Sequence, residues 1–123
     1  MQALDKLMMF SMAVSDMAKS KEFYEGTMGF KVTKDFGQGD KHWVSLELPG
    51  GGTSLTLTTA HERMKPGTMI LYVSAPDIEA AHKQLETDGA SEIADDLFGP
   101  GSGVKWFYID DPDANRWLVV QTK

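Results

Sequence analysis

The feature of this sequence that most constrains its fold is an internal repeat. The segments MAVSDMAKSKEFYEGTMGF and LYVSAPDIEAAHKQLETDGA share one order of landmarks: an apolar run ending in Val-Ser, then an Asp, a helical stretch and a Gly. The corresponding pairs are Val14 and Val73, Asp16 and Asp77, Gly29 and Gly89, Trp43 and Trp106, and Pro49 and Pro112. Such self-similarity predicts two copies of one unit, at about residues 5–60 and 66–123. A chain of 123 residues is the size of one domain, so we expect residues 1–123 to form a single one.

The elements within each copy follow from capping and periodicity. Asp16 and Asp77 are good N-caps because a carboxylate accepts the free amide protons of a first helical turn, which predicts helices beginning at about Met17 and Ile78. The second helix carries an apolar stripe at spacings of three and four, formed by Ile78, Ala81, His82 and Leu85. Period-two runs follow each helix: KVTKDF, HWVSLEL and TSLTLT, then SEIADDL, KWFYID and RWLVVQ. The sequence therefore predicts an α+β fold of two tandem βαβββ units, with eight strands and two helices.

Composition excludes several classes of function. The net charge is −6 and the 12 Lys and Arg residues are scattered, so no nucleic-acid partner is expected. No apolar run approaches the length of a membrane span, and the N-terminus lacks a basic leader with a cleavage site, which predicts a cytoplasmic protein without membrane contact. The absence of Cys excludes disulfides and thiolate chemistry. The acidic pairs Asp95–Asp96 and Asp110–Asp111 border turns, and we interpret them as solvated loop charge and caps.

The repeated βαβββ layout, with VSDMAKSKEFYEGTMGF near the start and DPDANRW near the end, resembles the vicinal oxygen chelate superfamily. This superfamily includes glyoxalase I, extradiol dioxygenases, fosfomycin resistance enzymes and metal-free bleomycin resistance proteins. The resemblance implies that the strands curve into one eight-stranded mixed sheet, a cup with the helices on its outer face, usually in a homodimer. In the enzymatic members four strands hold a divalent metal through His, Gln or Glu. Counted from the shared landmarks, those four positions are Met9, Thr56, Thr68 and Leu118.

These four side chains do not suit a metal. A hard divalent cation needs oxygen or imidazole donors, whereas the positions offer a thioether, two neutral hydroxyls and an isobutyl group. The three histidines, His42, His61 and His82, fall on different predicted elements and lack the spacing of a ligand set. We therefore expect no metal and no other cofactor.

The same four positions indicate which side chains face the cup, because side chains alternate between the two faces of a strand. The predicted lining is Met9, Ser11, Trp43, Ser45, Glu47, Thr56, Thr58, Thr68, Tyr72, Trp106, Tyr108 and Leu118. Apolar and aromatic walls with sparse polar groups are typical of a pocket for an organic ligand, and flat rings favour an aromatic or cationic guest. Two simpler interpretations stay open: Trp43 and Trp106 pack the cup shut, and Glu47 is a solvated side chain at a strand end.

Three classes of function remain from the sequence. The favoured one is a metal-free protein that binds a small organic molecule in the cup and forms a homodimer. The alternatives are a metal-dependent lyase, isomerase or dioxygenase of the same superfamily, and a metal-free enzyme that uses Glu47 or Tyr108, so catalytic residues are unassigned. The loop DDLFGPGSGVKW, residues 95–106, is either a flap over the cup or a plain connection. The sequence leaves open the identity of the ligand, and whether the two units pair within one chain or across a dimer.

Overall fold

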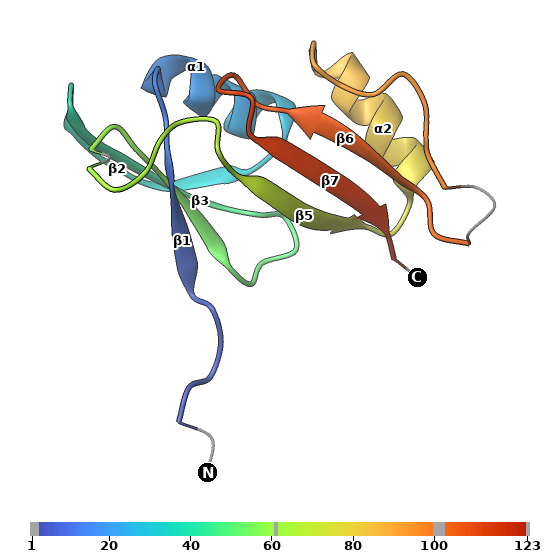
Figure 1. Ribbon diagram of the computed structural model, residues 1–123, viewed down its shortest axis with the longest axis horizontal. Coiled ribbons are helices and arrows are strands. Elements are labelled where there is room, and N and C mark those ends of the chain that lie inside the picture. Colours follow the sequence, from blue (N-terminus) through green and yellow to red (C-terminus); the bar gives the residue numbers. More distant parts are fainter. Residues whose placement is uncertain (1–2, 61, 100–102, 123) are drawn as a thin grey trace.

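The structure, a computed structural model, describes residues 3–60, 62–99 and 103–122. Its strands form two sheets, and in each sheet the first strand runs parallel to the last and the others are antiparallel (Figure 1). The first sheet, in the order β1-β4-β3-β2, contains β1 (Met9–Ala13), β2 (Lys31–Gln38), β3 (Lys41–Glu47) and β4 (Ser54–Thr58). The second sheet, in the order β5-β7-β6, contains β5 (Ile70–Ala75), β6 (Trp106–Asp110) and β7 (Arg116–Gln121). The two halves of the chain thus build sheets with related connectivity.

The helices begin where the capping residues predict. Helix α1 (Met17–Glu22) continues as a π-helical segment, η1 (Phe23–Thr27), and α2 spans Ile78–Thr87. The carboxylate of Asp16 accepts a hydrogen bond of 3.1 Å from the amide of Lys19, and that of Asp77 accepts one of 3.1 Å from Ala80. Helix α1 packs on β4 and α2 packs on β7, so each helix covers one face of its own sheet. None of the helices among the described residues is long and apolar enough to cross a membrane.

The prediction of eight strands in one curved sheet is wrong. The described residues form seven strands, divided into sheets of four and three. The missing strand is SEIADDL, residues 91–97, which precedes β6 in the chain. It and the adjacent Phe98 make only isolated bridges to β6, between Ile93 and Ile109 and between Phe98 and Trp106. Between these bridges the carboxylate of Asp96 accepts a 2.8 Å hydrogen bond from the amide of Leu97. A side chain that bonds the local backbone competes with the strand ladder, which explains the interruption.

The core lies between the sheets and the helices. Along β3, Val44 and Leu46 are fully buried on the helix side, whereas the alternate residues Trp43 and Ser45 lie on the opposite face. Buried residues of both halves form one hydrophobic cluster, which includes Met12, Val14, Met17, Tyr24, Phe30, Leu55, Leu57, Ile78, Phe107, Ile109, Trp117 and Val119. One core therefore unites both halves. We call the sheet faces that no helix covers the helix-free faces.

A buried polar network also joins the halves. Asp111 is only 3% exposed, so its interpretation as solvated loop charge is wrong, whereas its interpretation as a cap is confirmed: its Oδ1 atom accepts hydrogen bonds from the amides of Asp113 and Asn115. Its carboxylate accepts hydrogen bonds from the Tyr24 hydroxyl at 2.6 Å and from the Asn115 side-chain amide at 2.8 Å. The Trp117 indole donates to the Tyr24 oxygen at 2.9 Å. The polar groups of this turn thus find partners across the core, which is what makes the burial of a carboxylate tolerable.

Candidate binding site

The helix-free face of the first sheet has a row of small polar side chains at its centre. Strand pairing places Ser45 of β3 beside Thr56 of β4, and Thr56 beside Ser11 of β1. The Ser45 and Thr56 hydroxyl oxygens are 3.1 Å apart, and the Thr56 hydroxyl also lies 3.9 Å from the sulfur of Met9. The nearby Thr58 hydroxyl instead accepts a 3.0 Å hydrogen bond from the backbone amide of Ala60. These hydroxyls satisfy one another or the local backbone.

An aromatic pair borders this polar row. The rings of Phe36 and Trp43 stack with centroids 5.6 Å apart and an interplanar angle of 16°, and Phe36 is half exposed. Glu47 lies at the end of β3 and is exposed, opposite Lys31 of β2. The carboxylate therefore stands in solvent at the rim of the face.

The helix-free face of the second sheet is more strongly aromatic. Phe98 packs against Trp106, with centroids 4.7 Å apart, and against Tyr108, with centroids 6.2 Å apart. The guanidinium of Arg116 lies 4.0 Å from the Tyr108 ring centroid and makes hydrogen bonds of 2.8 and 3.0 Å to Asp110. Phe98 and Arg116 were not among the predicted lining residues. The strand alternation that selects Leu118 also selects Arg116, whereas Phe98 lies in an irregular segment with no period to reveal it.

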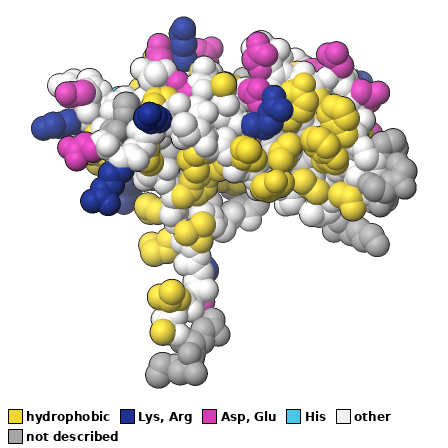
Figure 2. Space-filling model, in the orientation of Figure 1, with side chains coloured by type: hydrophobic (Ala, Val, Ile, Leu, Met, Phe, Trp, Pro, Cys, Tyr) yellow, Lys and Arg dark blue, Asp and Glu magenta, His cyan; other side chains and the backbone are white. Residues whose placement is uncertain are grey.

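This second face carries an apolar hollow of about 250 Å³, lined by Tyr72, Val104, Trp106, Leu118 and Val120. Figure 2 shows hydrophobic side chains gathered over the second sheet. Tyr72 is 73% exposed, so the first sheet does not cover it. The predicted flap, residues 95–106, falls partly on residues 100–102, which lie outside the described residues.

The predicted lining is therefore divided between two faces. Met9, Ser11, Trp43, Ser45 and Thr56 lie on the first, and Tyr72, Trp106, Tyr108 and Leu118 lie on the second. Thr68 belongs to neither, because it precedes β5 in a turn where its hydroxyl donates a 2.8 Å hydrogen bond to the Lys65 carbonyl. Met9 is 50% exposed, so its side chain, like that of Tyr72, is open to solvent. The two groups of predicted lining residues thus belong to two separate sheets.

The residues at the four positions that the resemblance assigns to a metal do not fit a divalent cation. The Thr56 hydroxyl is already hydrogen-bonded to Ser45 and Met9, the Thr68 hydroxyl bonds a turn, and Leu118 has no donor atom. No group of three or more His, Asp and Glu side chains among the described residues is placed to hold a metal; His61 lies outside them. His42 bonds Asp35 at 2.6 Å, and His82 bonds the Ala94 carbonyl at 2.6 Å.

Comparison with known proteins places the chain in a family. The profile of the Glyoxalase/Bleomycin resistance protein/Dioxygenase superfamily matches residues 5–119, and the chain belongs to this superfamily. The resemblance drawn from the sequence is thereby confirmed. An uncharacterized protein of Mycolicibacterium smegmatis is 30% identical over 85 residues, which cover 69% of this chain and 68% of that protein.

Solved structures share the fold. TnmS3, an antibiotic binding protein from Streptomyces sp. CB03234, superposes with a TM-score of 0.83 at 28% identity, covering 100% of both chains. A superfamily member from Sphaerobacter thermophilus superposes with a TM-score of 0.81 at 22% identity, covering 98% of this chain and 100% of that one. The second likeness shows the fold alone.

Proposed function

We propose that this protein binds a small aromatic or cationic organic molecule on its helix-free faces without using a metal. The observation that carries the proposal is the aromatic cluster of Phe98, Trp106 and Tyr108 beside an apolar hollow on the second sheet. Rings of this kind bind flat or cationic guests through stacking and cation–π contacts. The likeness to an antibiotic binding protein supports a small organic guest.

A second copy of the chain would complete the site. A ligand pocket usually buries most of its ligand, whereas Tyr72 and Ile70 on the second sheet are 73% and 66% exposed. β1 and β5 are edge strands of their sheets, so each offers a free edge to another chain. The segment before β1 projects from the body (Figures 1 and 2) and exposes Leu4, Leu7 and Met8. We propose a homodimer in which the first sheet of one copy faces the second sheet of the other.

Estimates of the binding free energy favour a site shared by two copies over a single open face. Three stacking contacts at about 1 kcal/mol each contribute about 3 kcal/mol beyond the burial of area. A dissociation constant of about 1 mM already corresponds to about 4 kcal/mol. Stacking alone would therefore give an open face a Kd no tighter than about 1 mM. Closure by the partner's sheet, which adds the rings of Trp43 and Phe36 and buries more of the ligand, raises the affinity.

Neither enzymatic alternative is favoured. The metal-position residues do not supply a donor set, and Glu47 is exposed at the end of its strand rather than set against an apolar wall. The ring of Tyr108 is covered on one side by Arg116 and contacts Phe98.

The experiment is a thermal-shift screen of EDTA-treated protein against aromatic antibiotics, including bleomycin and daunorubicin. A compound that binds the folded state raises the midpoint of unfolding by mass action. We expect at least one compound to raise Tm in wild type and to do so less in Trp106→Ala. If shifts appear only after a divalent metal is added, or if none of the panel shifts Tm, the proposal is wrong.

A further inference from the structure

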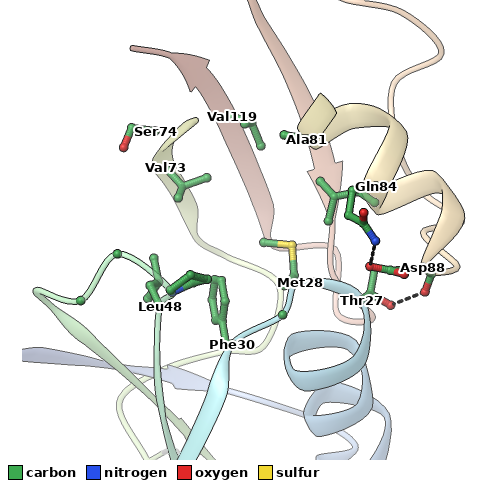
Figure 3. A pocket seen from close by; sticks show the side chains of 15 residues that line it. Thr27, Met28, Phe30, Leu48, Val73, Ser74, Ala81, Gln84, Asp88 and Val119 are labelled. Carbon is green, nitrogen blue, oxygen red and sulfur yellow. Dashed lines mark hydrogen bonds between the residues drawn. The ribbon is translucent and has the colours of Figure 1, made fainter. Parts of the chain in front are cut away.

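A separate cavity of about 440 Å³ lies on the helix side of the molecule (Figure 3). Both halves of the chain line it: the turn before β2, the turn after β3, strands β5 and β7, and one face of α2. Val73 and Val119 line this cavity, whereas their strand neighbours Tyr72 and Leu118 lie on the helix-free face. Because side chains alternate along a strand, the cavity and the proposed ligand face lie on opposite sides of the second sheet.

The walls of this cavity are apolar. Its larger hydrophobic side chains include Met28, Phe30, Leu48, Val73, Leu85 and Val119. Phe30 and Val119 are nearly buried members of the core, and the other four are partly exposed around them. The volume lies in the range of small-molecule pockets. Helix α2 therefore leaves a wedge of core surface open where the two halves meet.

One end of the cavity is polar and negative. Asp88 caps the C-terminus of α2, where its Oδ2 atom accepts a 2.8 Å hydrogen bond from the Gln84 side-chain amide. The Thr27 hydroxyl donates to the Asp88 carbonyl at 3.3 Å, and Figure 3 shows these three residues together at the edge of the cavity. The last turn of α2 contains no basic residue, and no Lys or Arg among the described residues pairs with Asp88. The negative end of the helix dipole thus meets an uncompensated carboxylate.

We propose that this cavity is a second binding site, for a small lipophilic cation. The apolar body of the ligand lies between Met28, Leu48 and Leu85, and its ammonium group contacts the Asp88 carboxylate at the C-terminus of α2. Charge complementarity selects a cation over a neutral or anionic molecule of equal shape. Because Asp88 is exposed, the selection amounts to a factor of about 2 to 5 in Kd, the strength of a screened charge at a helix terminus.

The test compares three probes that share one apolar body: 4-phenylbutylamine, 4-phenylbutan-1-ol and 4-phenylbutanoate. Each is titrated into the ¹⁵N-labelled full chain while amide shifts are followed by NMR. We expect saturable shifts at Met28, Leu48 and Leu85, with the amine binding most tightly and the carboxylate most weakly. Shifts of equal size and affinity for all three probes, or no saturable shift at these amides because a second copy covers the groove, would overturn the proposal.

Two variants locate the head and the body of the ligand. Asp88→Asn keeps the hydrogen-bonding shape but removes the charge, so the amine should bind like the alcohol while alcohol binding stays unchanged. Ala81→Met extends a side chain from α2 into the cavity and should weaken all three probes. If the amine keeps its advantage in Asp88→Asn, the head-group assignment is wrong, whether or not Ala81→Met folds. Shifts confined to Tyr72 and Trp106 would instead place the probe on the helix-free face, which separates failure of this site from failure of the proposed function.

Discussion

The hydroxyl of Tyr24 donates a 2.6 Å hydrogen bond to the Oδ2 atom of Asp111, linking two buried side chains 87 positions apart in the chain. Burial raises the pKa of Tyr24, and the negative charge of Asp111 raises it further, so the hydroxyl remains a neutral donor at physiological pH. The Ser15 amide reaches Asp113 of the same turn at 3.1 Å. The FY and DPDAN landmarks of the sequence therefore hold the two halves together.

The first prediction concerns this link. Tyr24→Phe removes a donor from the buried Asp111 carboxylate and an acceptor from the Trp117 indole, so it should lower the free energy of unfolding by about 2–3 kcal/mol. Urea unfolding measures the change. Tyr72→Phe is the matched control, because Tyr72 is 73% exposed, and it should change stability by less than about 0.5 kcal/mol. Equal effects in the two variants would show that the Tyr24 hydroxyl contributes nothing special.

The second prediction concerns pH. Hydrogen bonds from Lys21 at 2.7 Å and from His42 at 2.6 Å lower the pKa of Asp35 below its usual value. A carboxyl whose pKa is lower in the folded state adds stability above its unfolded pKa and loses it as pH falls through the folded value. The free energy of unfolding of wild type should therefore fall by up to about 1 kcal/mol below about pH 4, and the contribution is this small because the pair is partly exposed. Asp35→Asn lacks this contribution at every pH and should show no such fall.

Unfolding free energies measured from pH 7 to pH 2 test this assignment. Asp5→Asn, on the exposed segment before β1, is the control and should keep the wild-type profile. An Asp35→Asn profile parallel to wild type throughout the acid range would contradict the role of the ion pair.

The third prediction concerns a close approach between backbones. Gly67 has a φ of +79°, and a β-carbon there would lie 2.1 Å from the Asp113 carbonyl oxygen. Gly67→Ala should destabilise the protein by at least about 2 kcal/mol, through both the left-handed conformation and the clash. Gly26→Ala is the control: Gly26 lies in the helical segment η1, with no atom near its added carbon, and the change should stabilise by about 0.5–1 kcal/mol. Thermal unfolding of both variants checks the opposite signs.

The fourth prediction concerns the proposed dimer. Ile70 begins β5 at a free sheet edge and is 66% exposed in the single chain. Ile70→Lys should leave the fold intact but shift the protein to monomer in sedimentation velocity, because a charge at a paired edge disfavours association. Gln38→Lys, at the far end of β2, should leave the dimer unchanged. A wild-type protein that sediments as a monomer at all concentrations would refute the two-copy cup.

The sequence predicts local structure here better than the pairing of distant elements. The starts of both helices follow from Asp16 and Asp77, because an N-cap acts within one turn. The prediction of a strand at SEIADDL was wrong because strand formation there depends on its pairing partner and on the local hydrogen bond of Asp96. Neither can be inferred from the alternation of apolar and polar residues. Asp111 looked solvated because its partner Tyr24 is far away in the sequence.

The candidate site shows the same limit. Alternation along β3, β6 and β7 assigned Trp43, Trp106 and Leu118 to faces without helices, because the strand period is local. Thr68 was misplaced because the start of β5 is set by the turn at Lys65. Phe98 was missed because it reaches Trp106 from an irregular segment. The division of the lining between two open faces depends on how the halves pack, which no single segment encodes.

The most direct test of the central claim is a calorimetric titration with the compound that shifts Tm most, into wild type, Trp106→Ala and EDTA-treated protein. If the aromatic faces bind the ligand without a metal, EDTA leaves Kd unchanged and Trp106→Ala raises it at least about tenfold, the usual effect of removing a buried Trp contact. A Kd much weaker after EDTA treatment than before it, or a Kd unchanged in Trp106→Ala, would contradict the account.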